Sequence, residues 1–152
     1  MKKICLIVSA LIFCWNWDIS FSAAPDTAQK TVLDNGLTVL MKEIPTSPVV
    51  VVYALVKTGS TTEGKYLGCG ISHFVEHMLF KGTDQRAVGQ VAQEVMNKGG
   101  HVNASTNFDY SIYTIELPAG SFAEGLDIMA DVLQHSKFDP EETEKERKVI
   151  FG

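Results

Sequence analysis

The sequence has few cysteines, no excess of positive charge and no long apolar run. It contains three cysteines, of which Cys5 and Cys14 lie in an apolar N-terminal stretch. Cys69 is then the single cysteine of the remaining chain, so we expect no internal disulfide there. The 152 residues carry 13 Lys and Arg against 18 Asp and Glu, which gives a formal net charge of −5. No basic patch stands out, and this argues against nucleic acid as a partner.

The longest apolar run lies at the N-terminus, where Lys2 and Lys3 precede it. It covers 12 residues, 4–15, whereas a membrane-spanning helix needs about 20. The pattern is typical of a signal peptide over residues 1–24, followed by a short polar linker over 25–30. We therefore expect an exported protein, periplasmic or extracellular, with no stable membrane span. An uncleaved N-terminal anchor is the alternative.

The rest of the chain alternates between strand and helix patterns and contains no internal repeat. Asn35-Gly36 between two apolar runs predicts a β-hairpin. The β-branched run over 49–56 predicts a strand that is buried on both faces. Further strands are expected at 101–106 and 109–117, and helices at 71–80, 87–98, 121–135 and from Asp139 onward.

Three details of these helices are expected from the sequence. The helix over 71–80 is rich in apolar residues and should be largely buried. The helix over 121–135 has an apolar face, which we expect to consist of Phe122, Leu126, Met129, Ala130 and Leu133. Asp139 should cap the last helix, with Pro140 at its first position and Glu142 closing a capping box.

His73, Glu76 and His77 form the strongest candidate functional motif. At about 100° per residue, a helix places all three side chains on one face. Two neutral histidines suit a catalytic zinc ion, and the carboxylate beside them suits a general base acting on a zinc-bound water. A tetrahedral catalytic site needs a third protein ligand as well. Histidines that only pack in a buried helix are the alternative, but a buried carboxylate between them is costly without a partner.

Cys69 lies just before this helix and is a further candidate ligand. A small buried residue is the favoured interpretation for it, because the two histidines already have a better set of partners.

The residues around this motif resemble a known family. Gly70 to Thr83 is similar to the active-site segment of the pitrilysin/insulinase family, the inverzincins, and most similar to its processing-peptidase branch. The segments 99–106, 33–37 and 144–150 resemble its second signature, its opening hairpin and its third signature, in the family's order. The resemblance implies an α+β fold, an α/β two-layer arrangement of a mostly antiparallel sheet packed by helices. Residues 31–152 are then expected to be the N-terminal part of an inverzincin peptidase domain, incomplete at its C-terminus.

The resemblance also implies roles for individual residues of a zinc metalloendopeptidase. His73 and His77 match the two zinc-binding histidines. Glu76 matches the general base that takes a proton from the zinc-bound water and hands it to the leaving amine. Asn103 and Ala104 match an edge strand that binds an extended substrate by β-augmentation. Without the resemblance, Asn103 is interpreted as a turn or strand-edge residue.

The third zinc ligand of the family is a glutamate seven positions after an earlier glutamate of the same helix. Glu146 matches the earlier glutamate, whose role is at most supporting, and seven positions further is 153, beyond Gly152. The chain is therefore expected to bind zinc weakly and to have little or no activity alone.

The resemblance further implies a peptide or protein substrate and a second, related domain or a partner subunit. Two alternatives remain, a non-catalytic subunit or interaction module and an incomplete reading frame of a longer peptidase. Glu76 argues against the non-catalytic subunit, because non-catalytic relatives often lack it.

Overall fold

The structure is a computed structural model that describes residues 27–151. The signal peptide expected over 1–24 lies outside these described residues. The chain divides into two units, one up to Pro45 and one from Thr46 onward, and each is described by itself.

The first unit is a two-stranded hairpin. Strands β1 (Gln29–Val32) and β2 (Thr38–Met41) pair in antiparallel fashion. In the turn, Gly36 has a φ of 85°, which favours glycine, and Asn35 Oδ1 accepts a hydrogen bond of 3.0 Å from the main chain. The predicted hairpin is confirmed. Strand β1 begins inside the predicted linker, because the antiparallel register extends to Gln29, opposite the last residue of β2.

The second unit contains a three-stranded antiparallel sheet with the strand order β3-β5-β4. Its strands are β3 (Val49–Val56), β4 (His101–Thr106) and β5 (Ser111–Pro118). Its helices are α1 (Ile71–Leu79), α2 (Gln90–Asn97), α3 (Phe122–His135) and α4 (Pro140–Phe151). Short 3-10 turns at Ser60–Thr62 and Gly64–Tyr66 lead from β3 to α1, and a third at Ala119–Ser121 leads from β5 to α3.

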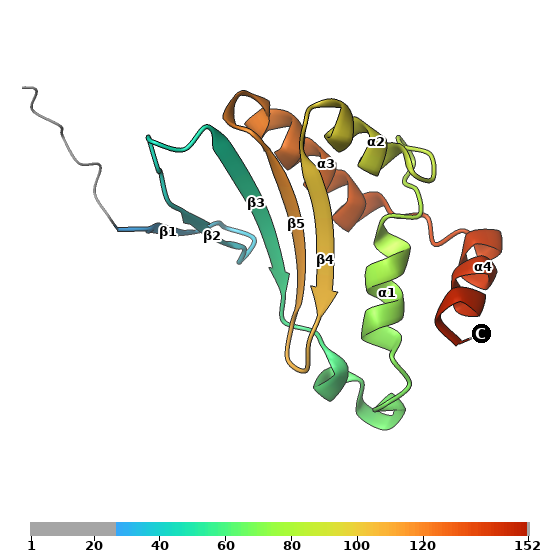
Figure 1. The fold of residues 1–152 in the computed structure, drawn as a ribbon. Helices are drawn as coiled ribbons and strands as arrows, with labels where there is room; N and C mark the ends of the chain where they lie inside the picture. Colours follow the sequence, from blue (N-terminus) through green and yellow to red (C-terminus); the bar gives the residue numbers. More distant parts are fainter. Residues whose placement is uncertain (1–26, 152) are drawn as a thin grey trace, which may run out of the picture. The chain divides into compact units, whose positions relative to one another are not determined.

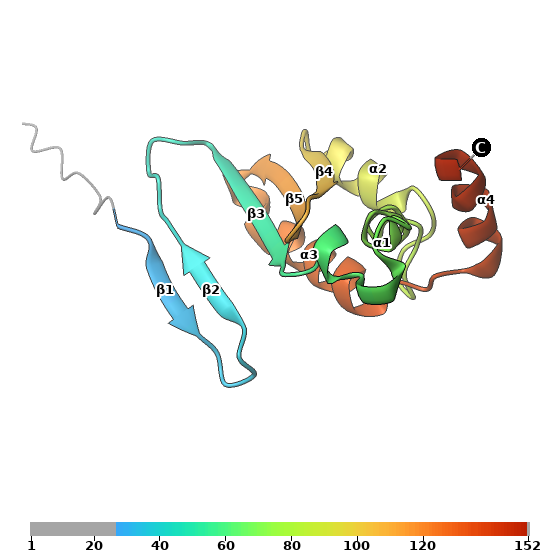
Figure 2. The ribbon, with the colours of Figure 1, turned by 90° about the horizontal axis from the view of Figure 1, so that it is seen from below.

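Helices α1, α2 and α3 pack against one face of this sheet, and α4 packs beside α1 (Figures 1 and 2). The predicted α+β fold with a mostly antiparallel sheet is confirmed. None of the helices in residues 27–151 is long and apolar enough to cross a membrane.

The hydrophobic core lies between the sheet and its covering helices. It is built from Val52, Leu79, Val91, Val95, Tyr113, Ile115, Leu117, Ile128, Met129 and Val132. Gly125 of α3 faces this core, and an added Cβ would lie 2.9 Å from Cδ1 of Leu117. Glycine at this position therefore lets α3 approach β5 closely, which decides the face that the helix buries.

The prediction that β3 is buried on both faces is wrong. Val52 is buried, but Val49, Val51, Tyr53 and Leu55 are exposed. These four residues point away from the covering helices, because successive side chains of a strand alternate between its two faces. An apolar run therefore does not mean two covered faces in this sheet.

The predicted apolar face of α3 is also partly wrong. Phe122, Leu126 and Leu133 are exposed, whereas Ile128 and Val132 are buried. The close approach at Gly125 turns a different side of the helix toward β5.

The predicted cap of α4 is confirmed, but its capping box is not formed. Oδ1 of Asp139 accepts hydrogen bonds from the main-chain N–H groups of Glu141 at 2.9 Å and Glu142 at 3.1 Å. The carboxylate of Glu142 instead accepts a hydrogen bond of 2.6 Å from Nζ of Lys145. Lys145 lies one turn further on and binds this carboxylate. The hydrogen bond of a capping box from the main-chain N–H of Asp139 to the Glu142 side chain is therefore not formed.

Candidate metal centre

Helix α1 carries the predicted motif, and its first turn is held by a residue from outside the helix. Oε1 of Glu63 accepts a hydrogen bond of 2.9 Å from the N–H of Ser72. This hydrogen bond holds the pKa of the Glu63 carboxyl below its usual range. A helix leaves its first N–H groups without partners inside the helix, so Glu63 acts as an N-terminal cap.

The helix is half-buried, so the prediction that it is largely buried is wrong. Glu76 and Met78 are buried, whereas His73 and Val75 are exposed. The face with the two histidines is therefore accessible, while the carboxylate between them is turned toward the sheet.

The two histidines converge through the same ring atom. Nε2 of His73 lies 3.1 Å from Nε2 of His77, and the two rings meet edge to face with centroids 4.6 Å apart. Two nitrogens bound to one tetrahedral zinc ion at about 2.05 Å would lie about 3.3 Å apart. One ligand atom from each of His73, Glu76 and His77 lies within 4.8 Å of the others. The two Nε2 atoms therefore have about the spacing of two ligands of one zinc ion.

Glu146 of α4 holds the ring of His77 from the opposite side. Its Oε1 lies 2.6 Å from Nδ1 of His77, and its Oε2 lies 2.5 Å from Nζ of Lys81. The Lys81 ammonium and the His77 ring hold the pKa of the buried Glu146 carboxyl below its usual range, against the opposing effect of burial. An ionised carboxylate only accepts hydrogen bonds, so Nδ1 of His77 donates. In the neutral ring the lone pair is then on Nε2, the atom that faces His73.

The carboxylate of Glu76 is held by the sheet. It is 9% exposed, and its Oε2 accepts a hydrogen bond of 2.5 Å from Oγ1 of Thr106, the last residue of β4. Burial raises the pKa of the nearby Tyr113 phenol, and the charge of Glu76 adds to this increase. The carboxylate therefore has a fixed position between α1 and the ends of the strands.

Asn103 and Ala104 lie in the middle of β4, beside α1 (Figure 1). Within the described sheet, β4 pairs with β5 on one side and with no strand on the other. Asn103 is opposite Thr114 and is exposed, and Ala104 is opposite Tyr113 and is half-buried. The structure thus places both residues on a free strand edge that lies next to the histidine helix.

Several residues that complete this site were not predicted from the sequence. Thr106 contacts Glu76, Lys81 contacts Glu146, and Glu63 contacts the first turn of α1. No periodic pattern predicts these contacts. Cys69 was expected to be buried but is exposed, and it does not belong to the group of possible metal ligands. Cys69 lies in a loop before the helix, where apolar residues do not recur at a regular spacing. The sequence pattern therefore does not predict whether its side chain is buried.

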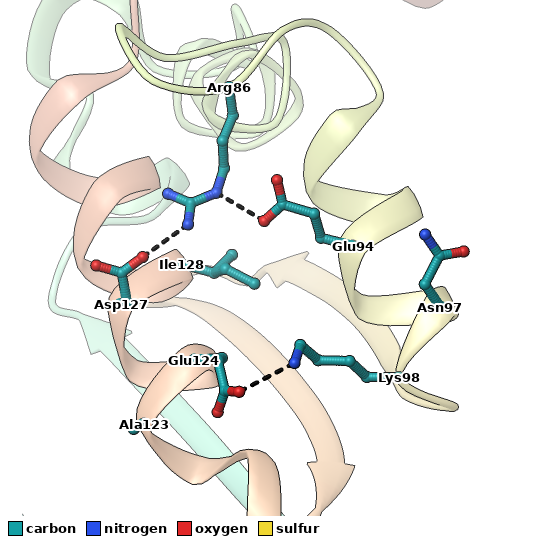
Figure 3. Close-up of a pocket in the computed structure, with 8 residues that line it drawn as sticks. All are labelled: Arg86, Glu94, Asn97, Lys98, Ala123, Glu124, Asp127 and Ile128. Atoms are coloured by element: carbon teal, nitrogen blue, oxygen red, sulfur yellow. Dashed lines mark hydrogen bonds and ion pairs between the residues drawn. The ribbon is translucent and has the colours of Figure 1, made fainter.

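An open cavity of about 600 Å³ lies between α2 and α3 (Figure 3), and His73, Glu76 and His77 are not among its lining residues. Its charged side chains are paired with one another. Arg86 contacts Glu94 at 3.0 Å and Asp127 at 2.6 Å, and Lys98 contacts Glu124 at 3.0 Å. These pairs join the two helices and do not belong to the candidate metal centre.

Comparisons with known proteins found similar families, sequences and structures. The model of the family described as insulinase, peptidase family M16, matches residues 38–151. A mitochondrial-processing peptidase subunit beta of Blastocladiella emersonii is 39% identical over 81% of this chain and 26% of its own length. An uncharacterized zinc protease of Rickettsia felis is 42% identical over 78% of this chain and 29% of its own length. The crystal structure of a protease from Helicobacter pylori has a TM-score of 0.77 and 31% identity, over 82% of this chain and 30% of that chain.

These relatives correct one prediction and establish another. The prediction of a periplasmic or extracellular protein is contradicted, because relatives with 39% and 37% identity are named mitochondrial-processing peptidase subunits. The chain spans less than a third of the length of the curated relatives that it matches. The family match covers three quarters of the chain, 114 of 152 residues counted from 38 to 151, and includes the histidine helix. The chain belongs to the insulinase family, peptidase family M16.

Proposed function

We propose that the chain is a zinc-dependent metalloendopeptidase, with His73 and His77 as zinc ligands and Glu76 as general base. The observation that carries this proposal is the convergence of the two Nε2 atoms at 3.1 Å beside the buried carboxylate. Relatives from Rickettsia felis and Bacillus subtilis that are named zinc proteases support it.

Different residues of the chain have different roles in the proposed peptide hydrolysis. A bound zinc ion supplies Lewis acidity, which lowers the pKa of a water ligand to about 7 and polarises a carbonyl. His73 and His77 present their Nε2 lone pairs, and Glu146 keeps the proton of His77 on Nδ1. Glu76 takes the proton from the attacking water and passes it to the leaving amine.

The free edge of β4 is the proposed binding site for the substrate. An extended peptide that adds to this edge makes main-chain hydrogen bonds beside Asn103 and Ala104. Because α1 packs next to β4, the peptide then runs past the histidine face. Main-chain recognition does not depend on side chains, so we expect tolerance of many peptide sequences at this edge.

A second domain or a partner subunit is also proposed. Relatives of this chain carry the name subunit beta. The exposed residues Val51, Tyr53 and Leu55 form an apolar stretch on β3, which suits contact with another protein surface. These observations also favour a second candidate function, a non-catalytic subunit of a peptidase complex.

Cleavage of an unstructured peptide separates the two functions. The purified chain, supplied with zinc at micromolar concentration, is expected to cleave a fluorescent peptide slowly. Among the described residues, the general base Glu76 is the one further donor group beside the two histidines, whereas a catalytic zinc takes three protein ligands. Glu76→Gln should bind zinc as tightly as the wild type and lose at least about 100-fold in rate. The matched control is Glu116→Gln, at an exposed position of β5.

Two results would count against the endopeptidase. Full activity of Glu76→Gln would overturn the role of Glu76. A wild-type chain that binds zinc and cleaves nothing would overturn the enzymatic proposal and favour the non-catalytic subunit.

A further inference from the structure

A chain of hydroxyl groups links Glu76 to the ends of all three strands of the sheet. Oγ1 of Thr106 donates to Oε2 of Glu76 at 2.5 Å and lies 3.2 Å from Oγ of Ser111. Ser111 is buried, and its hydroxyl donates to the carbonyl oxygen of Thr58 at 2.9 Å. The contacts therefore run from the end of β3 through the start of β5 and the end of β4 to the helix α1.

The register of the sheet explains why these groups meet. Thr106 is opposite Ser111 in the β4–β5 pair, and Ser111 is opposite Val56 in the β3–β5 pair. Thr58 lies two residues after Val56, and its N–H donates to the Val56 carbonyl at 2.8 Å. This tight turn directs the Thr58 carbonyl toward Ser111. The three strand ends thus place the hydroxyls of Ser111 and Thr106 next to each other, and the hydroxyl of Thr106 reaches the Glu76 carboxylate.

The number of protons on each hydroxyl group sets the direction of these hydrogen bonds. A hydroxyl has one proton to donate. The proton of Ser111 goes to the Thr58 carbonyl, and the proton of Thr106 goes to the Glu76 carboxylate. A hydrogen bond to a buried carboxylate restricts the rotation of that carboxylate, and residues that hold a reacting group in this way are often as important as the group itself.

We propose that Thr106 is a positioning residue for Glu76. This proposal rests on the proposed function, since it gives Glu76 the orientation that a general base needs. Thr106 itself touches neither metal nor substrate in this account. The hydroxyl is the group that matters, so serine should replace threonine and valine should not.

The test compares Thr106→Val, which keeps the shape of the side chain, with Thr106→Ser, which keeps the hydroxyl. Thr114→Val is the matched control, because Thr114 lies on the adjacent strand and faces the other side of the sheet. The first measurement needs neither metal nor activity. In the full chain with carboxyl-labelled glutamate, the ¹³C resonance of Glu76, assigned by its loss in Glu76→Gln, is recorded at constant pH.

The resonance is expected to shift in Thr106→Val and to stay in place in Thr106→Ser and Thr114→Val. The second measurement is peptide cleavage with zinc. Thr106→Val should lower kcat by about 10- to 100-fold with KM and zinc affinity within about twofold of the wild type, and Thr106→Ser should restore kcat.

Each outcome decides the proposal. An unchanged Glu76 resonance in Thr106→Val would overturn it, whatever the activity. A shifted resonance with unchanged kcat would reduce Thr106 to a structural residue and overturn it as well. A wild-type chain without cleavage but with the shifted resonance would overturn the proposed function and the catalytic part of this proposal, while the Thr106–Glu76 contact stands.

Discussion

Nδ1 of His77 donates a hydrogen bond of 2.6 Å to Oε1 of Glu146, a residue 69 positions further along the chain. Lys81 binds the other carboxylate oxygen at 2.5 Å. Helix α4 therefore fixes the tautomer of a proposed zinc ligand that belongs to α1. Partners of this kind orient the ring and raise the basicity of the metal-binding nitrogen.

Removal of the Glu146 carboxylate should weaken zinc binding. In Glu146→Ala, the ring of His77 loses its partner on Nδ1, and the proton can move to Nε2, where it competes with the metal. We expect a loss of about 10- to 100-fold in zinc affinity, measured by competition with a chromophoric chelator. Glu144→Ala is the control, because Glu144 lies on the same helix and is exposed. An affinity within twofold of the wild type in Glu146→Ala would contradict this role.

The cap formed by Glu63 should protect the first turn of α1. In Glu63→Ala, the N–H of Ser72 loses its acceptor, so its hydrogen–deuterium exchange should become faster. Glu63→Gln keeps an acceptor oxygen and should retain most of the protection. Exchange of the Ser72 amide is followed by NMR in the full chain, with Lys65→Ala as a control in the same loop. Equal protection in Glu63→Ala and the wild type would show that the cap is not formed.

Asp131 should make the stability of the fold sensitive to acid. Burial alone would raise the pKa of this carboxyl, but hydrogen bonds from Thr83, Arg86 and His135 outweigh it and hold the pKa below its usual range. A depressed pKa contributes stability that is fully present above the unfolded-state value, about 3.9, and is lost as the pH falls through the folded-state value. We expect the free energy of unfolding to decrease below about pH 4.

The variant Asp131→Asn tests this acid sensitivity. It should cost about 2 kcal/mol at pH 7, since a hydrogen-bonded charge inside the fold is removed, and it should show a shallower decrease below pH 4. Urea unfolding at a series of pH values measures both effects. An equally steep decrease in the variant would assign the acid sensitivity to other carboxylates.

The residues close together in sequence were predictable, because helical geometry is local. The spacing of His73, Glu76 and His77 places all three on one face of any helix, and the structure has them on α1. Asn35-Gly36 likewise forms the expected turn, and Asp139 the expected cap. The family resemblance added the edge strand with Asn103 and Ala104, which no local pattern would have marked.

The contacts between distant segments were not predictable in this way. The hydroxyl of Thr106 reaches Glu76 only because the register of β4 on β5 places the strand end beside α1. The face that α3 buries depends on the close approach at Gly125, which exposes Leu126 and buries Ile128. Such features depend on how elements pack, and the periodicity of a single element does not contain that information.

Zinc titration of the histidine variants distinguishes a metal centre from two histidines that only pack. We expect the wild-type chain to bind one zinc ion, and His73→Ala and His77→Ala each to abolish this binding. His101→Ala should bind zinc like the wild type, because His101 lies on β4 outside the proposed ligand set. Zinc content and affinity that are the same in the wild type, His73→Ala and His77→Ala would show that these histidines do not form a metal centre.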